Sequence, residues 1–116
     1  MINGLHAMIF SADAAADRAF LRDVLGFPFV DSGEDWLIFK MPPAEMGVHP
    51  ADGSHHEVYF MCDDVAGTVA DLRGRGVEIV SEPTDRGYGV VASFRLPGGG
   101  VIEVYEPRHP KAIDLP

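Results

Sequence analysis

Two histidines lie at matching places in two similar stretches of this sequence. One stretch runs from His6 to Asp13 and the other from His56 to Asp63, and each passes through apolar residues to an Asp seven positions after its His. Imidazole serves as a metal ligand and as an acid–base group, although a single His in an apolar strand is more often a hydrogen-bonded core residue. With 5 His in 116 residues, a match by composition alone has odds on the order of one in twenty-five. The pair is therefore a candidate for chemistry.

The elements that would position these histidines also occur twice. Each apolar stretch is expected to form a strand, and a helix is expected after it, over residues 14–25 in the first half and 65–75 in the second. Gly26 and Gly76 end these helices, because glycine enters the left-handed conformation without a Cβ penalty. Both glycines lie twenty residues after the His of their half.

Side chains with oxygen atoms precede both expected helices. Ser11 or Asp13 is expected to cap the first helix, and Asp63 or Asp64 the second, by accepting from free backbone N–H groups. The apolar spacing predicts a core-facing side for each helix. The inward residues expected are Ala16, Phe20, Leu21, Val24 and Leu25 in the first helix and Val65, Val69 and Leu72 in the second. The residues of the first helix expected to face water are Asp17, Arg18, Arg22 and Asp23.

Strand-like runs complete both halves. The runs lie at 1–11, 27–32, 36–41 and 45–49 in the first half and at 56–62, 77–81, 90–96 and 101–106 in the second. The sequence therefore predicts an α+β fold made of two βαβββ modules. Two copies at a period near 50 residues favour a pseudo-twofold domain over a solenoid. We expect one domain over 1–107, with module one at 1–50, module two at 55–107, and a Pro-containing, loosely held tail at 108–116.

Composition narrows the functional classes. The chain has 116 residues, 47% of them apolar, which suits a single compact domain. A net charge of −9 disfavours nucleic acid and acidic membrane surfaces as partners. The single cysteine, Cys62, excludes an internal disulfide and fits a reducing, cytoplasmic location. We see no apolar run of membrane-spanning length and expect no signal peptide.

The paired modules, the two His-to-Asp stretches and the motif Leu25-Gly26-Phe27 resemble the vicinal oxygen chelate superfamily. That superfamily includes glyoxalase I, extradiol dioxygenases and bleomycin-binding proteins. The run from Leu96 to Val104 is similar to the family pattern Asp-Pro-x-Gly-Asn-x-Ile-Glu-Leu, but Leu96 replaces the usual Asp and Gly100 the usual Asn. The resemblance covers residues 4 to about 107, nearly the whole chain.

This resemblance implies eight strands curled around a cleft, with a divalent metal on its floor. The implied metal ligands are His6, His56 and Glu103, with Glu45 or His49 as a possible fourth. Such a set suits Fe, Mn, Ni or Zn and leaves positions open for substrate. Glu103 and Glu45 would then be the catalytic carboxylates, and no nucleotide or flavin cofactor is expected.

Aromatic residues are the candidate substrate contacts. Tyr88 stands in a loop that closes over the substrate in relatives, so it is the preferred pocket residue, with Trp36 and Phe60 beside it. Most other aromatics are expected in the core. Cys62 is interpreted as a buried structural thiol, and His109, in the tail, as exposed.

Three functions fit these features. The first is a divalent-metal-dependent enzyme (a lyase, isomerase, thiol transferase or dioxygenase) acting on a small oxygenated molecule. The second is a metal-free protein that binds aromatic or cationic drug-type molecules in the same cleft. The third is a structural or regulatory protein whose cleft is filled by side chains. The resemblance also implies a homodimer, with the modules paired within one chain or exchanged between two.

Overall fold

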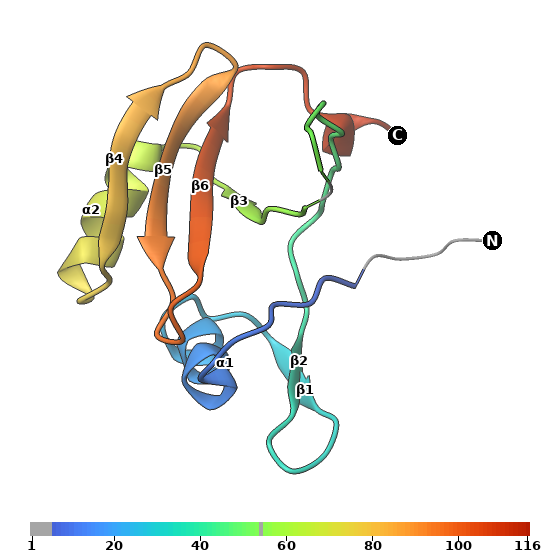
Figure 1. Ribbon diagram of the computed structural model, residues 1–116, viewed down its shortest axis with the longest axis vertical. Coiled ribbons are helices and arrows are strands. Elements are labelled where there is room, and N and C mark those ends of the chain that lie inside the picture. Colours follow the sequence, from blue (N-terminus) through green and yellow to red (C-terminus); the bar gives the residue numbers. More distant parts are fainter. Residues whose placement is uncertain (1–5, 54) are drawn as a thin grey trace.

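The computed structural model describes residues 6–53 and 55–116 (Figure 1). Two α-helices, six strands and a short 3-10 helix, η1, form within this part of the chain. In chain order they are α1 Ala14–Asp23, β1 Phe29–Asp31, β2 Leu37–Phe39, β3 Tyr59–Met61, α2 Val65–Gly74, β4 Ile79–Asp85, β5 Gly89–Arg95, β6 Val101–Pro107 and η1 Ala112–Asp114.

The second half forms the βαβββ unit that its sequence predicts. Its four-stranded sheet has the order β3-β6-β5-β4, in which β3 runs parallel to β6 and the other pairs are antiparallel. Helix α2 covers one face of this sheet (Figure 1). Val65, Val69 and Leu72 are buried there, as expected from their spacing.

The main core lies between this sheet and the helices. Its buried members are Phe20, Leu72, Phe94, Leu96, Ile102 and Val104. Phe20 reaches this core from α1, and its ring stacks on Phe94 with centroids 5.8 Å apart. Module one is thus anchored to module two by this aromatic pair, together with a second one between Phe27 and Phe60.

Asp17 strengthens this anchor, and the prediction that it faces water is wrong. The residue is only 6% exposed. Its Oδ1 accepts a hydrogen bond of 2.7 Å from the backbone N–H of Gly98, in the β5–β6 turn. A Cβ on Gly98 would lie 1.9 Å from Ser11 Oγ, so this close approach requires glycine. A partner 81 residues away overrides the tendency of a helical Asp to face solvent.

The two helix caps fix how the modules correspond. Asp13 caps α1 by accepting from the N–H of Ala16, and Asp64 caps α2 by accepting from the N–H of Gly67. Of the two candidates for the second cap, the structure therefore selects Asp64. The histidine-to-cap spacing is seven residues in the first module and eight in the second.

The first half departs from the expected plan. Only a short antiparallel hairpin, β1–β2, forms between α1 and β3, with Phe29 opposite Phe39. Residues 6–11 and 45–49 form no strand, and the rest of the expected first strand, residues 1–5, lies outside the described residues. The described chain therefore has six strands, and neither the expected eight nor the pseudo-twofold pairing is confirmed.

Neither of these two segments pairs with another strand of the described chain. A strand needs a partner for its backbone N–H and C=O groups. Ile9 packs against the main core, but other apolar side chains of the two segments are left in solvent: Phe10 is 91% exposed and Val48 96%.

Neither helix in the described part of the chain has the length and apolar character needed to cross a membrane.

Candidate functional site

Four aromatic side chains gather on the sheet of module two, and we call them the aromatic cluster: Tyr59, Tyr88, Tyr105 and His109. Tyr105 is at the centre. Its ring centroid lies 5.7 Å from Tyr59, 6.0 Å from Tyr88 and 5.8 Å from His109. The cluster draws on β3, the β4–β5 loop, β6 and the tail, so it depends on the folded sheet.

Strand alternation explains why this cluster faces away from the core. On β6, Ile102 and Val104 are buried in the core, whereas Glu103 and Tyr105 point to the opposite face. Tyr59 on β3 pairs with Glu103, which brings the two onto the same side. The aromatic cluster and Glu103 thus share the face that α2 leaves uncovered.

Two carboxylates lie beside the cluster. Burial raises the pKa of Glu103, and the nearby charge of Glu57 raises it further, while Arg86 acts in the opposite direction. The phenol of Tyr59 donates to Glu57 Oε2. This hydrogen bond lowers the pKa of Glu57 and, with burial, raises the pKa of Tyr59. The face therefore combines aromatic rings with negative charge.

A third carboxylate, Glu45, reaches the cluster from module one. Its side chain is 16% exposed, and its Oε1 lies 3.8 Å from His109 Nε2. Its Oε2 accepts a hydrogen bond of 2.6 Å from the N–H of Ala112. Burial raises the pKa of Tyr105, and the charges of Tyr88 and Glu45 add to this effect.

The expected metal ligands are not brought together. Both His6 and His56 are exposed, and His56 lies three residues before β3 begins. Within residues 6–53 and 55–116, no three His, Cys, Asp or Glu side chains are grouped so that they could hold a metal ion. The described donor set therefore does not fit the metal that the resemblance implies, although Glu103 is in the site.

Glu57 is the acid that sequence reading missed. When the two modules are aligned on their caps, Asp13 and Asp64, the residue that corresponds to His6 is Glu57 and not His56. Aligning the modules on Asp63 instead of Asp64 shifts the correspondence by one residue. Such a shift moves a strand side chain to the other face of the sheet, so it selects His56 in place of Glu57.

The predicted pocket residues are scattered. Tyr88 joins the aromatic cluster. Phe60 packs against the core on the other side of β3, where its ring meets Phe27 edge-on at 5.6 Å. Trp36 belongs to the β1–β2 hairpin, at the far end of the molecule from the β4–β5 loop (Figure 1), and the Arg18 guanidinium lies 4.6 Å from its ring centroid.

The other expected candidates have local partners. The Nδ1 atom of His49 lies 2.7 Å from the carbonyl oxygen of Pro50, and the charge of His49 lowers the pKa of Glu57. Cys62 is half-buried against the core. His109 is exposed, as expected, but it also contacts Tyr105 and Glu45.

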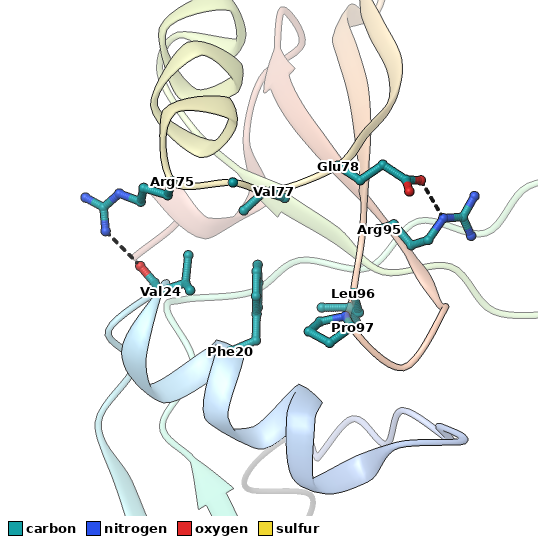
Figure 2. Close-up of a pocket in the computed structure, with 9 residues that line it drawn as sticks. Phe20, Val24, Arg75, Val77, Glu78, Arg95, Leu96 and Pro97 are labelled. Atoms are coloured by element: carbon teal, nitrogen blue, oxygen red, sulfur yellow. Dashed lines mark hydrogen bonds and ion pairs between the residues drawn. The ribbon is translucent and has the colours of Figure 1, made fainter.

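A separate pocket of about 320 Å³ lies where α1 meets module two (Figure 2). Phe20, Val24, Val77, Leu96 and Pro97 supply apolar lining, and Arg75, Glu78 and Arg95 lie at its edges. Its charges already have partners: Arg75 donates to the carbonyl of Val24 at 3.1 Å, and Arg95 pairs with Glu78 at 2.7 Å. We therefore place the candidate site at the aromatic cluster, with which this pocket shares no residue.

Comparison with solved structures gives the fold relatives. TnmS3, an antibiotic binding protein from Streptomyces sp. CB03234, is 25% identical with a TM-score of 0.65, over 92% of this chain and 99% of that one. A lactoylglutathione lyase from Agrobacterium tumefaciens is 20% identical with a TM-score of 0.65, over 89% and 92%. UcmS2 is 20% identical with a TM-score of 0.64, over 91% and 99%. No curated protein matches the chain.

The family comparison agrees with the structural one. The model described as Glyoxalase/Bleomycin resistance protein/Dioxygenase superfamily matches residues 5–104. This span contains both helices and nearly the whole sheet that carries the site. The chain belongs to the glyoxalase/bleomycin resistance protein/dioxygenase superfamily.

Proposed function

We propose that this protein binds a small molecule that carries a flat aromatic group and a positive charge. The observation that carries the proposal is that the rings of Tyr59 and Tyr88 lie 5.7 Å and 6.0 Å from the ring of Tyr105, with Glu57 and Glu103 beside them. Aromatic faces attract cations and stack on flat rings. The net charge of −9 also attracts a cationic ligand.

The similarity to the antibiotic binding protein TnmS3 supports a binding role, since the match covers 92% of this chain and 99% of TnmS3. The chemistry of the face supports a flat, cationic ligand, because such a molecule meets both the rings and the carboxylates.

A metal-dependent lyase, isomerase, thiol transferase or dioxygenase stays the second candidate. The observation in its favour is that Glu103 has a raised pKa beside a second carboxylate, Glu57. Carboxyl groups with displaced pKa values are frequent among catalytic acids and bases. The described residues supply no third ligand beside this pair, so we assign no metal-dependent step to it.

The binding proposal is tested by calorimetric titration at pH 8 with two flat probes, the cation 1-methylquinolinium and its neutral relative quinoline. The cation should bind more tightly, and Tyr105→Ala should weaken its binding by about tenfold or more, because ring stacking and cation–π contacts are lost together. Tyr105→Phe, which keeps the ring, is the matched control and should change the affinity little. Equal affinity for both probes, or unchanged binding in Tyr105→Ala, would contradict the proposal.

We also propose that two copies of the chain associate through module one. Its unpaired segments expose a series of large apolar side chains: Met8, Phe10, Met41, Met46 and Val48. An exposed apolar surface of this kind marks an interaction site, and an extended segment without a neighbour can add a strand to another chain.

Sedimentation velocity over a concentration series measures this association. The wild-type protein should sediment as a dimer, and Phe10→Asp with Val48→Asp should shift it to monomer while leaving the far-ultraviolet circular dichroism unchanged. The control is Asp52→Asn, an exposed polar change in the same module. A wild-type protein that stays monomeric at the highest concentration would exclude the dimer.

A further inference from the structure

The C-terminal tail lies against the candidate binding face. In Figure 1 the tail leaves the end of β6 and runs to the segment of module one that contains Glu45. Arg108 starts this path: its N–H donates to the carbonyl of Tyr88 at 2.9 Å, and its guanidinium pairs with Asp85. The β4–β5 loop therefore directs the tail toward the aromatic cluster.

Beyond Arg108, two residues of the tail contact the site. The imidazole of His109 lies 5.8 Å from the ring of Tyr105, tilted by 36°, and its Nε2 lies 3.8 Å from Glu45 Oε1. Three residues later, the N–H of Ala112 donates to Glu45 Oε2 at 2.6 Å. Glu45 thus holds the tail through the hydrogen bond from Ala112, with His109 beside its other carboxylate oxygen.

His109 stands where a ligand of the proposed class would bind. It presents a flat ring to an aromatic face and a ring nitrogen to a carboxylate, which are the two features that a flat aromatic cation would use. We infer that residues 108–116 form a strap that occupies one end of the binding face through His109 and Glu45, and that the ligand displaces it. The displacement rests on the proposed function, but the docking of the strap does not.

The strap is built to be displaced. None of residues 108–116 is buried, so its release exposes little apolar surface. Its other ion pairs, Arg108 with Asp85 and Lys111 with Asp114, both lie at the surface, and such pairs hold a segment weakly. Pro110 restricts the backbone of the strap. The change in conformational entropy when the strap opens or closes is therefore small.

Hydrogen exchange by NMR tests the docking without any ligand. In the full-length protein the Ala112 amide should be protected, and Glu45→Ala should speed its exchange at least tenfold because the acceptor is gone. Asp114→Asn is the control, since Asp114 pairs only within the strap, and it should leave Ala112 protected. Equal exchange of Ala112 in the wild-type protein and Glu45→Ala would overturn the strap.

Titration with 1-methylquinolinium then tests the displacement. The cation should remove the protection of Ala112 in the wild-type protein, and His109→Ala should bind it severalfold more tightly, because a competing ring has been removed. Binding that leaves Ala112 protected would overturn the displacement while the proposed function stands. If neither the wild-type protein nor His109→Ala binds the cation, the proposed function and the displacement both fail, and the exchange result alone decides the docking.

Discussion

Replacing Phe94 by Ala is expected to lower the free energy of unfolding by about 3–5 kcal/mol, the range found for a large aromatic residue removed from a packed core. Phe94 is 1% exposed and lies in the main core cluster with Leu72 and Ile102. Its ring also stacks on Phe20. The substitution therefore leaves a cavity and also removes the aromatic pair that joins α1 to the sheet.

Urea unfolding followed by circular dichroism measures this loss, with Val101→Ala as the control. Val101 pairs with Arg95 on the neighbouring strand, but its side chain is 44% exposed. Shortening an exposed side chain should change stability by no more than about 0.5 kcal/mol. A loss for Phe94→Ala that is no larger than the loss for Val101→Ala would show that α1 and the sheet do not share this core.

Most of the second module is predictable because its helix and its antiparallel strand pairs join segments that are close in sequence. The spacing of Val65, Val69 and Leu72 defines a helix face without reference to any other segment. The turn at Pro97 to Gly100 places β5 and β6 side by side as an antiparallel pair. Helix, turns and strands each had a local signal, and these signals agreed with one another.

The first module was less predictable because strands depend on partners. The segments at 6–11 and 45–49 have an apolar pattern typical of strands, yet periodicity alone cannot identify a neighbour. Asp17 shows the same limit, because its partner, Gly98, is distant in sequence. A pattern reports what a segment prefers, whereas the fold also depends on what lies beside it.

Three residues that the resemblance singles out, Glu103, Glu45 and Tyr88, lie at the aromatic cluster or beside it. Glu57 was missed because two adjacent aspartates competed for one cap. His109 was missed because a Pro-rich tail is usually loosely held. Each miss concerns a distance or a register that only three-dimensional packing decides.

Glu103→Gln should raise stability near neutral pH and weaken binding, and these two effects have the same cause. Burial and the charge of Glu57 raise the pKa of Glu103 above the usual carboxyl value. A carboxyl whose pKa is higher in the folded than in the unfolded protein favours folding while it is protonated. This stabilisation is complete at pH values below the unfolded-state pKa and is lost as the pH rises through the folded-state pKa. Above that value the wild-type protein holds a poorly solvated negative charge, which the neutral amide of Gln removes.

The same charge should attract the cationic ligand. We expect the variant to bind 1-methylquinolinium about tenfold more weakly at pH 7, equivalent to about 1.4 kcal/mol. Binding by the wild-type protein should also weaken as the pH falls through the raised pKa of Glu103, whereas the variant should lack that component.

Urea unfolding and calorimetric titration of both proteins from pH 4 to pH 8 separate these effects from a general disturbance of the fold. The stability difference in favour of Gln should grow with pH, because only the wild-type carboxyl becomes charged. Glu78→Gln is the matched control, since Glu78 is exposed and pairs with Arg95 away from the aromatic cluster. A stability difference for Glu103→Gln that does not vary with pH would mean that burial of this carboxyl does not matter. Weaker binding combined with higher stability, by contrast, is expected of a residue kept for its function at a cost to the fold.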